Sequence, residues 1–398
     1  MPATREPAVL VTDARWRKAL STARALGRRG IRVLTCDSTR LVPAALSRYV
    51  ERHLVFPAPA TDPEGFVAAL AALGAREPGL VCFPQEDPTV ALVAEARARV
   101  GGVVVPLPAA DAVAVALDKH ATAERAASLG IAVPRTVLPA GPEDLDGVRA
   151  LAFPVVVKPR RAWGSQGFTV VERPEDLRAA YARVDAVFPR PLVQERIPAA
   201  GEAHGVSCLF NAAGTLRAAF VHRRLREYPI GGGPSTLRAS VLRPDLVAAS
   251  ARLLTALGWT GFAMVEWKTD PRDGIARILE INPRFVGSLE LALRSGVDFP
   301  SLLYEVATTG DCAEVTAYKV GQLCRWLVPG DVLHYLANPD RARLEPSFFR
   351  FRGPDLAYDD WARDDPLPSI AQVGVVALQA LRPSMWRYVR RRETPMPA

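Results

Sequence analysis

Residues 8–108 alternate short apolar runs with helical patterns, and this alternation limits the fold more than any other feature of the sequence. The apolar runs lie at 8–12, 31–37, 54–57, 79–84 and 101–108, and helical periodicity fills 17–28, 65–73 and 88–99. Buried strands that alternate with helices predict a parallel sheet with helices on both faces. We therefore expect a Rossmann-like sheet in this part of the chain.

The turn after the first run bears on the class of ligand. A nicotinamide-dependent enzyme of this layout carries GxGxxG at that point. Here the segment reads TDARWRKALSTARALG, and its first glycine is Gly27. The sequence thus predicts the sheet of a dinucleotide-binding domain without its phosphate-binding turn.

The pattern changes near Leu117 to a mixture of helices and paired strands. The stretch ALDKHATAERAASLG predicts one helix that ends near Gly130, and FPVVVKP predicts a strand with a lysine at its end. The loop RRAWGSQG leads into FTVVERPEDL, where we expect a strand and a capped helix, and PLVQERI predicts another strand. VSCLFN and LRAAFVHRR then predict an antiparallel pair. After residue 310 the pattern is irregular.

Oxygen-bearing side chains gather in a predicted hairpin. FAMVEWKTD and ARILEIN flank the turn signal DPRDG, and Glu280 and Asn282 lie two residues apart on one strand face. Glu266 of the other arm can meet them on that face. Two carboxylates and an amide suit Mg²⁺, whereas the alternative is a polar strand end before a turn. Without a metal the two carboxylates are expected to repel, so Glu280→Gln is expected to stabilise the fold.

Two lysines and a glycine-rich loop suit a polyphosphate. Lys119 opens a helix, Lys158 ends a strand, and WGSQG (163–167) offers backbone N–H groups in a segment where glycine permits close approach. Each lysine alone is compatible with an exposed surface position, and glycine-rich hairpin loops are common. Beside the acidic hairpin, they predict a site for Mg²⁺ and a nucleoside triphosphate.

The order Lys119, VVVKP, GSQG, VQERI, VEW and LEINPR resembles the ATP-grasp superfamily, in particular its carboxylate–amine ligases similar to carbamoyl-phosphate synthetase and D-alanine–D-alanine ligase. HRRLREYPIGGGPST and EINPRFVGSLELALRSGVDFP resemble a bacterial subgroup of poorly defined substrate. The resemblance covers about residues 5–310. It implies an α/β and α+β architecture: a Rossmann-like pre-ATP-grasp domain (1–115), a two-lobed ATP-grasp domain (116–310, lobes about 116–195 and 196–310) and a C-terminal extension (311–398) of unassigned role.

The resemblance also implies nucleotide-binding residues. Lys119 and Lys158 match lysines that touch ATP phosphates, and residues 163–167 match a flexible loop that folds over the triphosphate. The loop residues concerned are Gly164, Ser165 and Gly167, and the linker that meets adenine, largely through its backbone, comprises Gln194, Glu195, Arg196 and Ile197. Glu202 matches the acidic residue at the ribose, with His204 as an alternative.

Further positions match the reacting end of the nucleotide. Glu266, Glu280 and Asn282 match the Mg²⁺ ligands, with Mn²⁺ as an alternative ion. Arg284 matches the arginine that meets the transferred phosphate or the substrate carboxylate, and the predicted catalytic set is Arg284, Lys158 and Arg238. Arg223, Arg224 and Arg238 are candidates to bind an anionic substrate; the alternative is a basic strand edge beside a mobile loop that contains GGGPST.

These residues lead to a functional expectation. Transfer of the γ-phosphoryl group converts a carboxylate into an acyl phosphate that an amine can attack, and the protein need only position the reactants and neutralise charge. We expect an ATP- and Mg²⁺-dependent ligase with a small-molecule carboxylate and amine as partners, and a PQED loop (84–87) that helps form the acceptor pocket. The alternatives are carboxylation or phosphorylation without an amine, a non-catalytic nucleotide-binding protein, and a basic nucleic-acid binder.

The charge and the apolar pattern limit which partners and which cellular compartment are expected. The net charge is +8, but arginines are interleaved with acids and no nucleic-acid-binding motif is visible, so no nucleic-acid partner is expected. Five cysteines without CxxC predict free thiols in a reducing compartment. The N-terminus lacks a signal-peptide pattern and the apolar stretch at 370–381 is too short to span a bilayer, so a cytoplasmic location is expected. A homodimer is left open, and WRYVRRRE (386–393) is either a solvated helix end or a contact with an anionic membrane surface.

Overall fold

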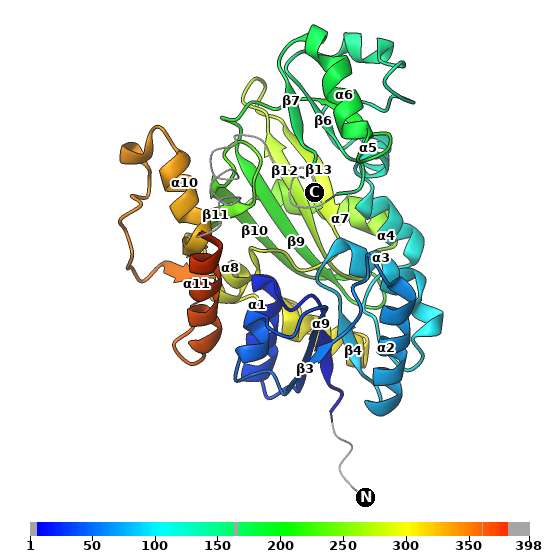
Figure 1. Cartoon of the computed structure of the whole chain (residues 1–398), viewed down its shortest axis with the longest axis vertical. Coiled ribbons are helices and arrows are strands. Elements are labelled where there is room, and N and C mark those ends of the chain that lie inside the picture. The colour runs from blue at the N-terminus through cyan, green and yellow to red at the C-terminus, as the bar shows by residue number, and fades with distance from the viewer. Residues whose placement is uncertain (1–5, 163–165, 360, 381–398) are drawn as a thin grey trace, which may run out of the picture.

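The computed structural model describes residues 6–162, 166–359 and 361–380 (Figure 1), and the strands within them form three sheets. The first is parallel, in the order β3-β2-β1-β4, and comprises β1 (Val9–Val11), β2 (Val33–Asp37), β3 (Arg52–Val55) and β4 (Val81–Phe83). Its helices are α1 (Arg17–Arg28), α2 (Pro63–Arg76) and α3 (Asp87–Glu95), with short 3₁₀ turns η1 (Pro43–Leu46) and η2 (Arg97–Arg99). The expected Rossmann-like layout is confirmed.

The strand predicted at 101–108 does not form. This segment contributes a single parallel bridge, between Val104 and Val81, and then leaves the sheet. Pro106 and Pro108 follow the bridge, and because proline has no backbone N–H it cannot continue a ladder of hydrogen bonds. The apolar run at 101–108 correctly indicated burial, but it did not indicate a strand.

The single helix predicted around Leu117 is two helices that meet at Asp118. These are α4 (Ala110–Leu117) and α5 (Lys119–Ser128). Asp118 is extended, and its carboxylate accepts hydrogen bonds from the backbone N–H groups of His120 (3.0 Å) and Ala121 (3.3 Å), which caps α5. The break makes Lys119 the first residue of α5 and fixes the direction of its side chain.

The second sheet is antiparallel and smaller, in the order β5-β8-β6-β7. It comprises β5 (Thr136–Val137), β6 (Val155–Lys158), β7 (Thr169–Val171) and β8 (Leu192–Glu195). The helix α6 (Leu177–Asp185) and the 3₁₀ turns η3 (Asp146–Ala150) and η4 (Pro174–Asp176) belong to the same lobe. Val155 and Val157 pack with Tyr181 and Val184 of α6, so the alternate residues of β6, including Lys158, face the other way.

The third sheet has seven strands, in the order β13-β12-β9-β10-β11-β14-β15 (Figure 1). Its first five are β9 (Ala203–Phe210), β10 (Leu216–Glu227), β11 (Ser235–Ser240), β12 (Gly261–Thr269) and β13 (Ala276–Asn282), and its helices are α7 (Pro244–Ala256), α8 (Leu289–Arg294) and α9 (Phe299–Thr309). The predicted hairpin and antiparallel pair are both present. Phe285 packs edge-on against Phe83 of the first sheet and against Phe262 of the third, so one core joins the two sheets.

The third sheet continues beyond residue 310. The strands β14 (Leu323–Arg325) and β15 (Leu356–Tyr358) extend it past β11. Between these two strands lie η5 (Leu327–Asp331), α10 (Val332–Ala337) and η6 (Arg341–Arg343), and α11 (Leu367–Ala380) follows β15. Arg226 and Arg325 both bind the buried carboxylate of Asp331, at 2.9 and 2.6 Å, and so fasten this segment to β10. Strands of three residues are too short to show a period in sequence. No helix in the described ranges is both long enough and apolar enough to cross a membrane.

Candidate active site

A cavity of about 300 Å³ opens between the second and third sheets. Its walls come from α5, β6, β8, β12, β13 and the loop between β10 and β11. The predicted residues that line it are Lys119, Lys158, Gln194, Glu195, Arg196, Ile197, Arg224, Glu266, Glu280, Asn282 and Arg284. Residues from five separate parts of the sequence (119, 158, 194–197, 224 and 266–284) therefore share one cavity.

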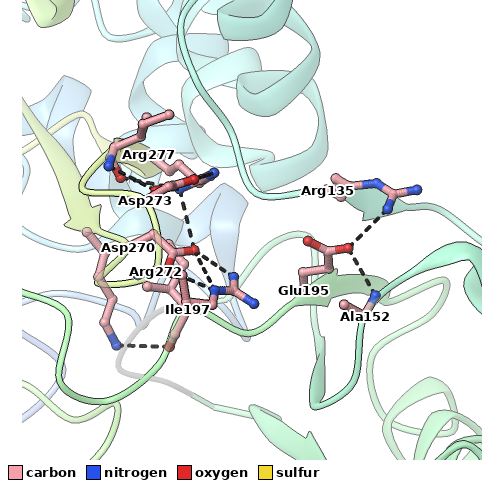
Figure 2. Close-up of polar contacts among 10 residues, drawn as sticks. Arg135, Ala152, Glu195, Ile197, Asp270, Arg272, Asp273 and Arg277 are labelled. Atoms are coloured by element: carbon pink, nitrogen blue, oxygen red, sulfur yellow. Dashed lines mark hydrogen bonds and ion pairs between the residues drawn. The ribbon is translucent and has the colours of Figure 1, made fainter.

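The β12–β13 hairpin brings the predicted metal ligands together. Glu266 lies directly opposite Glu280 in the ladder, and the Asn282 amide donates a hydrogen bond to Glu280 Oε1 at 3.2 Å. The turn of the hairpin is held by Asp270, which accepts from Arg272, and by Asp273, which accepts from Arg277 (Figure 2). Between this turn and the carboxylates the register shifts by one residue at Leu279, and this bulge places Glu280 opposite Glu266.

The donor set of the hairpin fits magnesium. Two carboxylates and an amide supply hard oxygen ligands, and Mg²⁺ commonly takes few protein ligands because it retains water or substrate phosphate oxygens. Within the described ranges no three His, Cys, Asp or Glu side chains gather into a closed metal cage. The wall formed by Glu266, Glu280 and Asn282 is therefore suited to an ion that is shared with a phosphorylated substrate.

Two lysines face this wall. Lys119 Nζ lies 3.2 Å from Glu280 Oε2 and donates to the carbonyl of Ala162 at 2.6 Å. Burial, together with the positive charge of Lys119, lowers the pKa of Lys158 to about 8. Burial opposes ionisation of Glu280, but Lys119 and Lys158 outweigh it and bring the pKa of Glu280 down to about 2. The two lysines thus keep Glu280 ionised, although they repel each other.

Arg224 binds Glu266, the second carboxylate of the wall. Its guanidinium donates to Glu266 Oε1 at 2.9 Å, to Glu227 Oε2 at 3.1 Å and to the carbonyl of Gly233 at 3.2 Å. Burial raises the pKa of Glu266 despite Arg224, and the charge of Glu280 adds to the rise. Arg224 thus links the acidic hairpin to the glycine-rich loop above the cavity.

Arg284 connects the cavity to the N-terminal sheet. It forms an ion pair with Asp87, the last residue of the PQED loop, and Lys18 forms a second pair with Glu86 of the same loop. The acids around Arg284 overcome its burial and raise its pKa, so it is charged. No residue of this loop lines the cavity, and the loop reaches it only through the contact between Asp87 and Arg284.

The predicted adenine linker lines the cavity, and the Glu195 side chain is held by neighbours of the second sheet. Glu195 accepts hydrogen bonds from Arg135 (3.3 Å) and from the backbone N–H of Ala152 (3.0 Å), as Figure 2 shows. Gln194 donates to Thr136 Oγ1 at 2.7 Å. Both side chains are engaged within the lobe of the second sheet, so the backbone of this linker remains available to a ligand.

Other predicted residues lie elsewhere. Glu202 is half exposed and pairs with Arg223 at 2.8 Å, and neither residue nor His204 lines the cavity. Arg238 is fully buried, where it pairs with Asp359 and donates to the carbonyl of Gly287. Burial lowers the pKa of Arg238 to about 10. Arg238 thus links β11 to the C-terminal segment, and it does not line the cavity.

The described part of the phosphate loop lies at the cavity edge. Gly164 and Ser165 fall outside the described residues, whereas Gln166 and Phe168 line the cavity. Gly167 has φ 66°, and a Cβ there would come within 2.8 Å of Pro159. Glycine at this position is therefore required by the backbone, whatever binds beside it.

Three charged residues of the cavity were not predicted from the sequence. Lys268 donates to the carbonyl of Ile197 at 3.4 Å, Glu227 accepts from Gly231 N–H at 2.9 Å, and Arg17 stacks over Trp326 at 3.8 Å. Lys268 could have been found, because it lies two residues after Glu266 and so projects from the same strand face. The other two depend on long-range packing, and no local pattern marks them.

Parts of the chain are similar in sequence to known proteins. Residues 188–328 match the model of a family described as "ATP-grasp in the biosynthetic pathway with Ter operon". The chain is 28% identical over 174 residues to acetyl-CoA carboxylase of Saccharomyces cerevisiae, and 37% identical over 75 residues to D-alanine–D-alanine ligase of Cupriavidus necator. These matches cover 42% and 19% of the chain but only 8% and 23% of the two relatives.

Solved structures share the fold over a larger part of the chain. The biotin carboxylase domain of 2-oxoglutarate carboxylase from Hydrogenobacter thermophilus is similar with a TM-score of 0.65 and 13% identity, over 80% of this chain and 73% of that one. The L-amino acid ligase from Bacillus licheniformis is similar with a TM-score of 0.61 and 18% identity, over 76% and 74%. At these identities the likeness concerns the fold. The family match makes residues 188–328 similar to ATP-grasp proteins.

Proposed function

We propose that the chain is an ATP- and Mg²⁺-dependent ligase that activates a carboxylate as an acyl phosphate and transfers it to an amine. The observation that carries the proposal is the meeting of two lysines with the Glu266, Glu280 and Asn282 wall in one cavity. The biotin carboxylase domain from Hydrogenobacter thermophilus was solved with MgADP and bicarbonate, which supports the nucleotide and the ion.

Nucleotide binding would replace the present ion pairs without unbalancing them. Lys119 now pairs with Glu280, and Arg224 pairs with Glu266. A triphosphate takes up the positive charge of Lys119 and Lys158, while Glu266, Glu280 and Asn282 would hold Mg²⁺, which supplies charge neutralisation at the phosphates when bound. Each buried charge keeps an opposite partner in both states, which limits the cost of desolvation.

The chemistry then needs no protein nucleophile. A carboxylate oxygen of the substrate attacks the γ-phosphorus, the bond to ADP breaks, and an acyl phosphate forms. The amine nitrogen next attacks the acyl carbon, the carbon–oxygen bond to phosphate breaks, and the nitrogen loses a proton. Lys158 and Arg284 remain charged beside the reacting groups and stabilise the negative charge that develops.

Carboxylation is the second candidate, because two of the similar proteins are an acetyl-CoA carboxylase and a biotin carboxylase domain. In that reaction bicarbonate takes the place of the organic carboxylate as phosphoryl acceptor. The two reactions use the same nucleotide and the same cavity wall. The acid that accepts the phosphoryl group therefore distinguishes them.

The test has two stages. Thermal melting with ATP, with Mg²⁺, and with both should give stabilisation only with both, because a ligand of the native state raises its stability. ADP release is then measured over a panel of carboxylic acids, with bicarbonate included, and hydroxylamine traps any acyl phosphate as a hydroxamate. No stabilisation by ATP with Mg²⁺ would overturn the proposal, and ADP release with bicarbonate alone would replace the ligase with the carboxylase.

A further inference from the structure

A buried histidine that the proposed function does not use lines the cavity. His222 of β10 is only 4% exposed. The ladders place Glu280, Glu266, Gly205 and His222 in one row across β13, β12, β9 and β10. Residues in one row of a sheet project from the same face, so His222 shares the face of the two carboxylates of the candidate metal site.

Gly205 leaves the space that the His222 ring fills. A Cβ at Gly205 would lie 2.2 Å from His222 Cε1 and 2.9 Å from Nε2. Because Gly205 stands between Glu266 and His222 in the row, the imidazole leans over it toward the acidic hairpin. The ring is therefore directed at the part of the cavity where the proposed function places Mg²⁺.

His222 is a neutral hydrogen-bond donor in positive surroundings. Burial, together with the charges of Arg238 and Arg224, lowers the pKa of His222 well below 6.5. A neutral imidazole carries one N–H and one lone pair. Nδ1 is enclosed and has no hydrogen-bond partner among the described residues, and since an enclosed N–H rarely lacks an acceptor, the proton belongs on Nε2. The positive charges that keep the ring neutral also favour an anion beside it.

Arg17 of α1 supplies a positive charge to the same cavity. Its guanidinium stacks over Trp326 at 3.8 Å and pairs with Asp359 at 3.4 Å, so the segment after residue 310 orients it. A Cβ at Gly287 would lie 2.6 Å from Arg17 Nη2, which shows that the guanidinium packs directly on the backbone of another cavity residue. Arg17 is thus held at the cavity by residues far apart in the sequence.

We propose that Arg17 and His222 bind the carboxylate that accepts the phosphoryl group, an inference that rests on the proposed function. Both side chains lie near the buried Arg238, whose charge interacts with each of them. Arg17 pairs with the negative charge of the carboxylate, and His222 Nε2–H donates to the oxygen that does not attack phosphorus. That oxygen becomes the oxyanion when the amine adds to the acyl carbon, so the hydrogen bond strengthens in that step. Arg284 then meets the transferred phosphate.

The first measurement is an NMR titration of the full chain, labelled with ¹⁵N-histidine, with acetate in the presence and absence of MgADP. The sequence has five histidines, and the spectrum of His222→Gln identifies the His222 signals. We expect a neutral ring with its proton on Nε2 at pH 7, and an Nε2 signal that shifts and saturates with acetate. An imidazolium at pH 7, a proton on Nδ1, or a signal that acetate does not move would overturn the proposal.

Two variants test the two side chains separately. Gly205→Ala displaces the His222 ring and Arg17→Met removes the charge. Each should weaken acetate binding at least about tenfold, whereas the Kd for ATP with Mg²⁺ should change less than about twofold, because the nucleotide contacts lie on other residues. Arg28→Met, at the exposed end of the same helix as Arg17, is the matched control and should change neither quantity. Acetate binding that both variants retain would overturn the proposal.

Thermal stabilisation by ATP with Mg²⁺, measured in parallel, separates failure of this site from failure of the proposed function. Stabilisation without an acetate response overturns the site alone, and an acetate response without stabilisation overturns the nucleotide reaction and retains the carboxylate site. With a carboxylic acid that releases ADP, His222→Leu should lower kcat for amide formation about 100-fold, and His222→Gln, which keeps an N–H donor, should recover most of that loss. Equal losses in the two variants would overturn the hydrogen bond.

Discussion

The ionisation of Glu280 depends on the charges of its neighbours. The sequence led us to expect that Glu280→Gln would stabilise the fold by removing repulsion from Glu266. The structure reverses that sign, because Lys119 and Lys158 outweigh burial and repulsion and bring the pKa of Glu280 to about 2. We predict that Glu280→Gln lowers the free energy of unfolding by on the order of 2 kcal/mol, since it removes the ion-pair partner of the partly buried Lys119 and a neutralising charge near the buried Lys158. ADP release should fall about 100-fold or more.

The pH dependence gives an independent check on Glu280. A carboxylate with a lowered pKa contributes stability above its unfolded pKa, near 4.5, and loses it as the pH falls toward 2. The stability difference between wild type and Glu280→Gln should therefore shrink below pH 4.5 in chemical denaturation. Glu124→Gln, at an exposed position on α5, is the control and should change neither stability nor rate. A variant Glu280→Gln that is more stable than wild type at pH 7 would contradict the structure.

Lys158 should set an upper pH limit on nucleotide binding. Its pKa of about 8 lies below the ordinary lysine value of 10.5, so the side chain is charged below pH 8 and becomes neutral above it. Phosphates bind the charged form, so the Kd for ATP with Mg²⁺ should rise above pH 8 by up to about tenfold per pH unit. Calorimetric titration between pH 7 and 9.5 measures this. Lys158→Arg retains its charge and should show a flat profile; equal slopes in both proteins would refute the assignment.

At the scale of elements, the loop between β10 and β11 offers a paired test. A Cβ at Gly233 would lie 2.1 Å from the backbone carbon of Tyr228, whereas a Cβ at Gly232 would meet only Phe168, at 3.6 Å. Gly233→Ala must therefore displace the loop and the carbonyl that Arg224 binds. We predict loss of several degrees in Tm and weaker ATP binding for Gly233→Ala, and near wild-type behaviour for Gly232→Ala. Similar melting curves for the two variants would show that the loop relaxes freely.

The elements that sequence predicted correctly share a local cause. The β12–β13 hairpin follows from two alternating runs around DPRDG, and its register puts Glu266 opposite Glu280 as expected. The elements that it missed depend on contacts between distant residues. The break at Asp118 is stabilised by an ion pair with Arg160 at 2.5 Å, forty-two residues away, and β14 pairs with β11 across more than eighty residues. Local periodicity in the sequence therefore predicts neither the break nor this strand pairing.

At the scale of the whole molecule, the pair between Asp87 and Arg284 joins the N-terminal sheet to the cavity. We predict that Asp87→Asn lowers ADP release about tenfold or more while the Kd for ATP with Mg²⁺ changes little, because Arg284 loses the group that positions it but the nucleotide contacts lie on other elements. Glu64→Gln removes an exposed acid that pairs with Arg99 in the same domain and should leave both quantities unchanged. Equal loss of binding and turnover in Asp87→Asn would place Asp87 in the nucleotide site instead.

The sequence by itself determined the parallel N-terminal sheet, the order of the candidate phosphate-binding and metal-binding segments and the residues on the acidic hairpin, because each follows from chemistry or periodicity within a few residues. Only the tertiary structure decided which of the charged residues reach the cavity. Arg224 and Lys268 line it, whereas Arg238 is buried against Asp359 and Glu202 is half exposed beside Arg223. The physical reason is that a strand fixes which face a side chain takes, but the packing of sheets from distant parts of the chain fixes what that face meets.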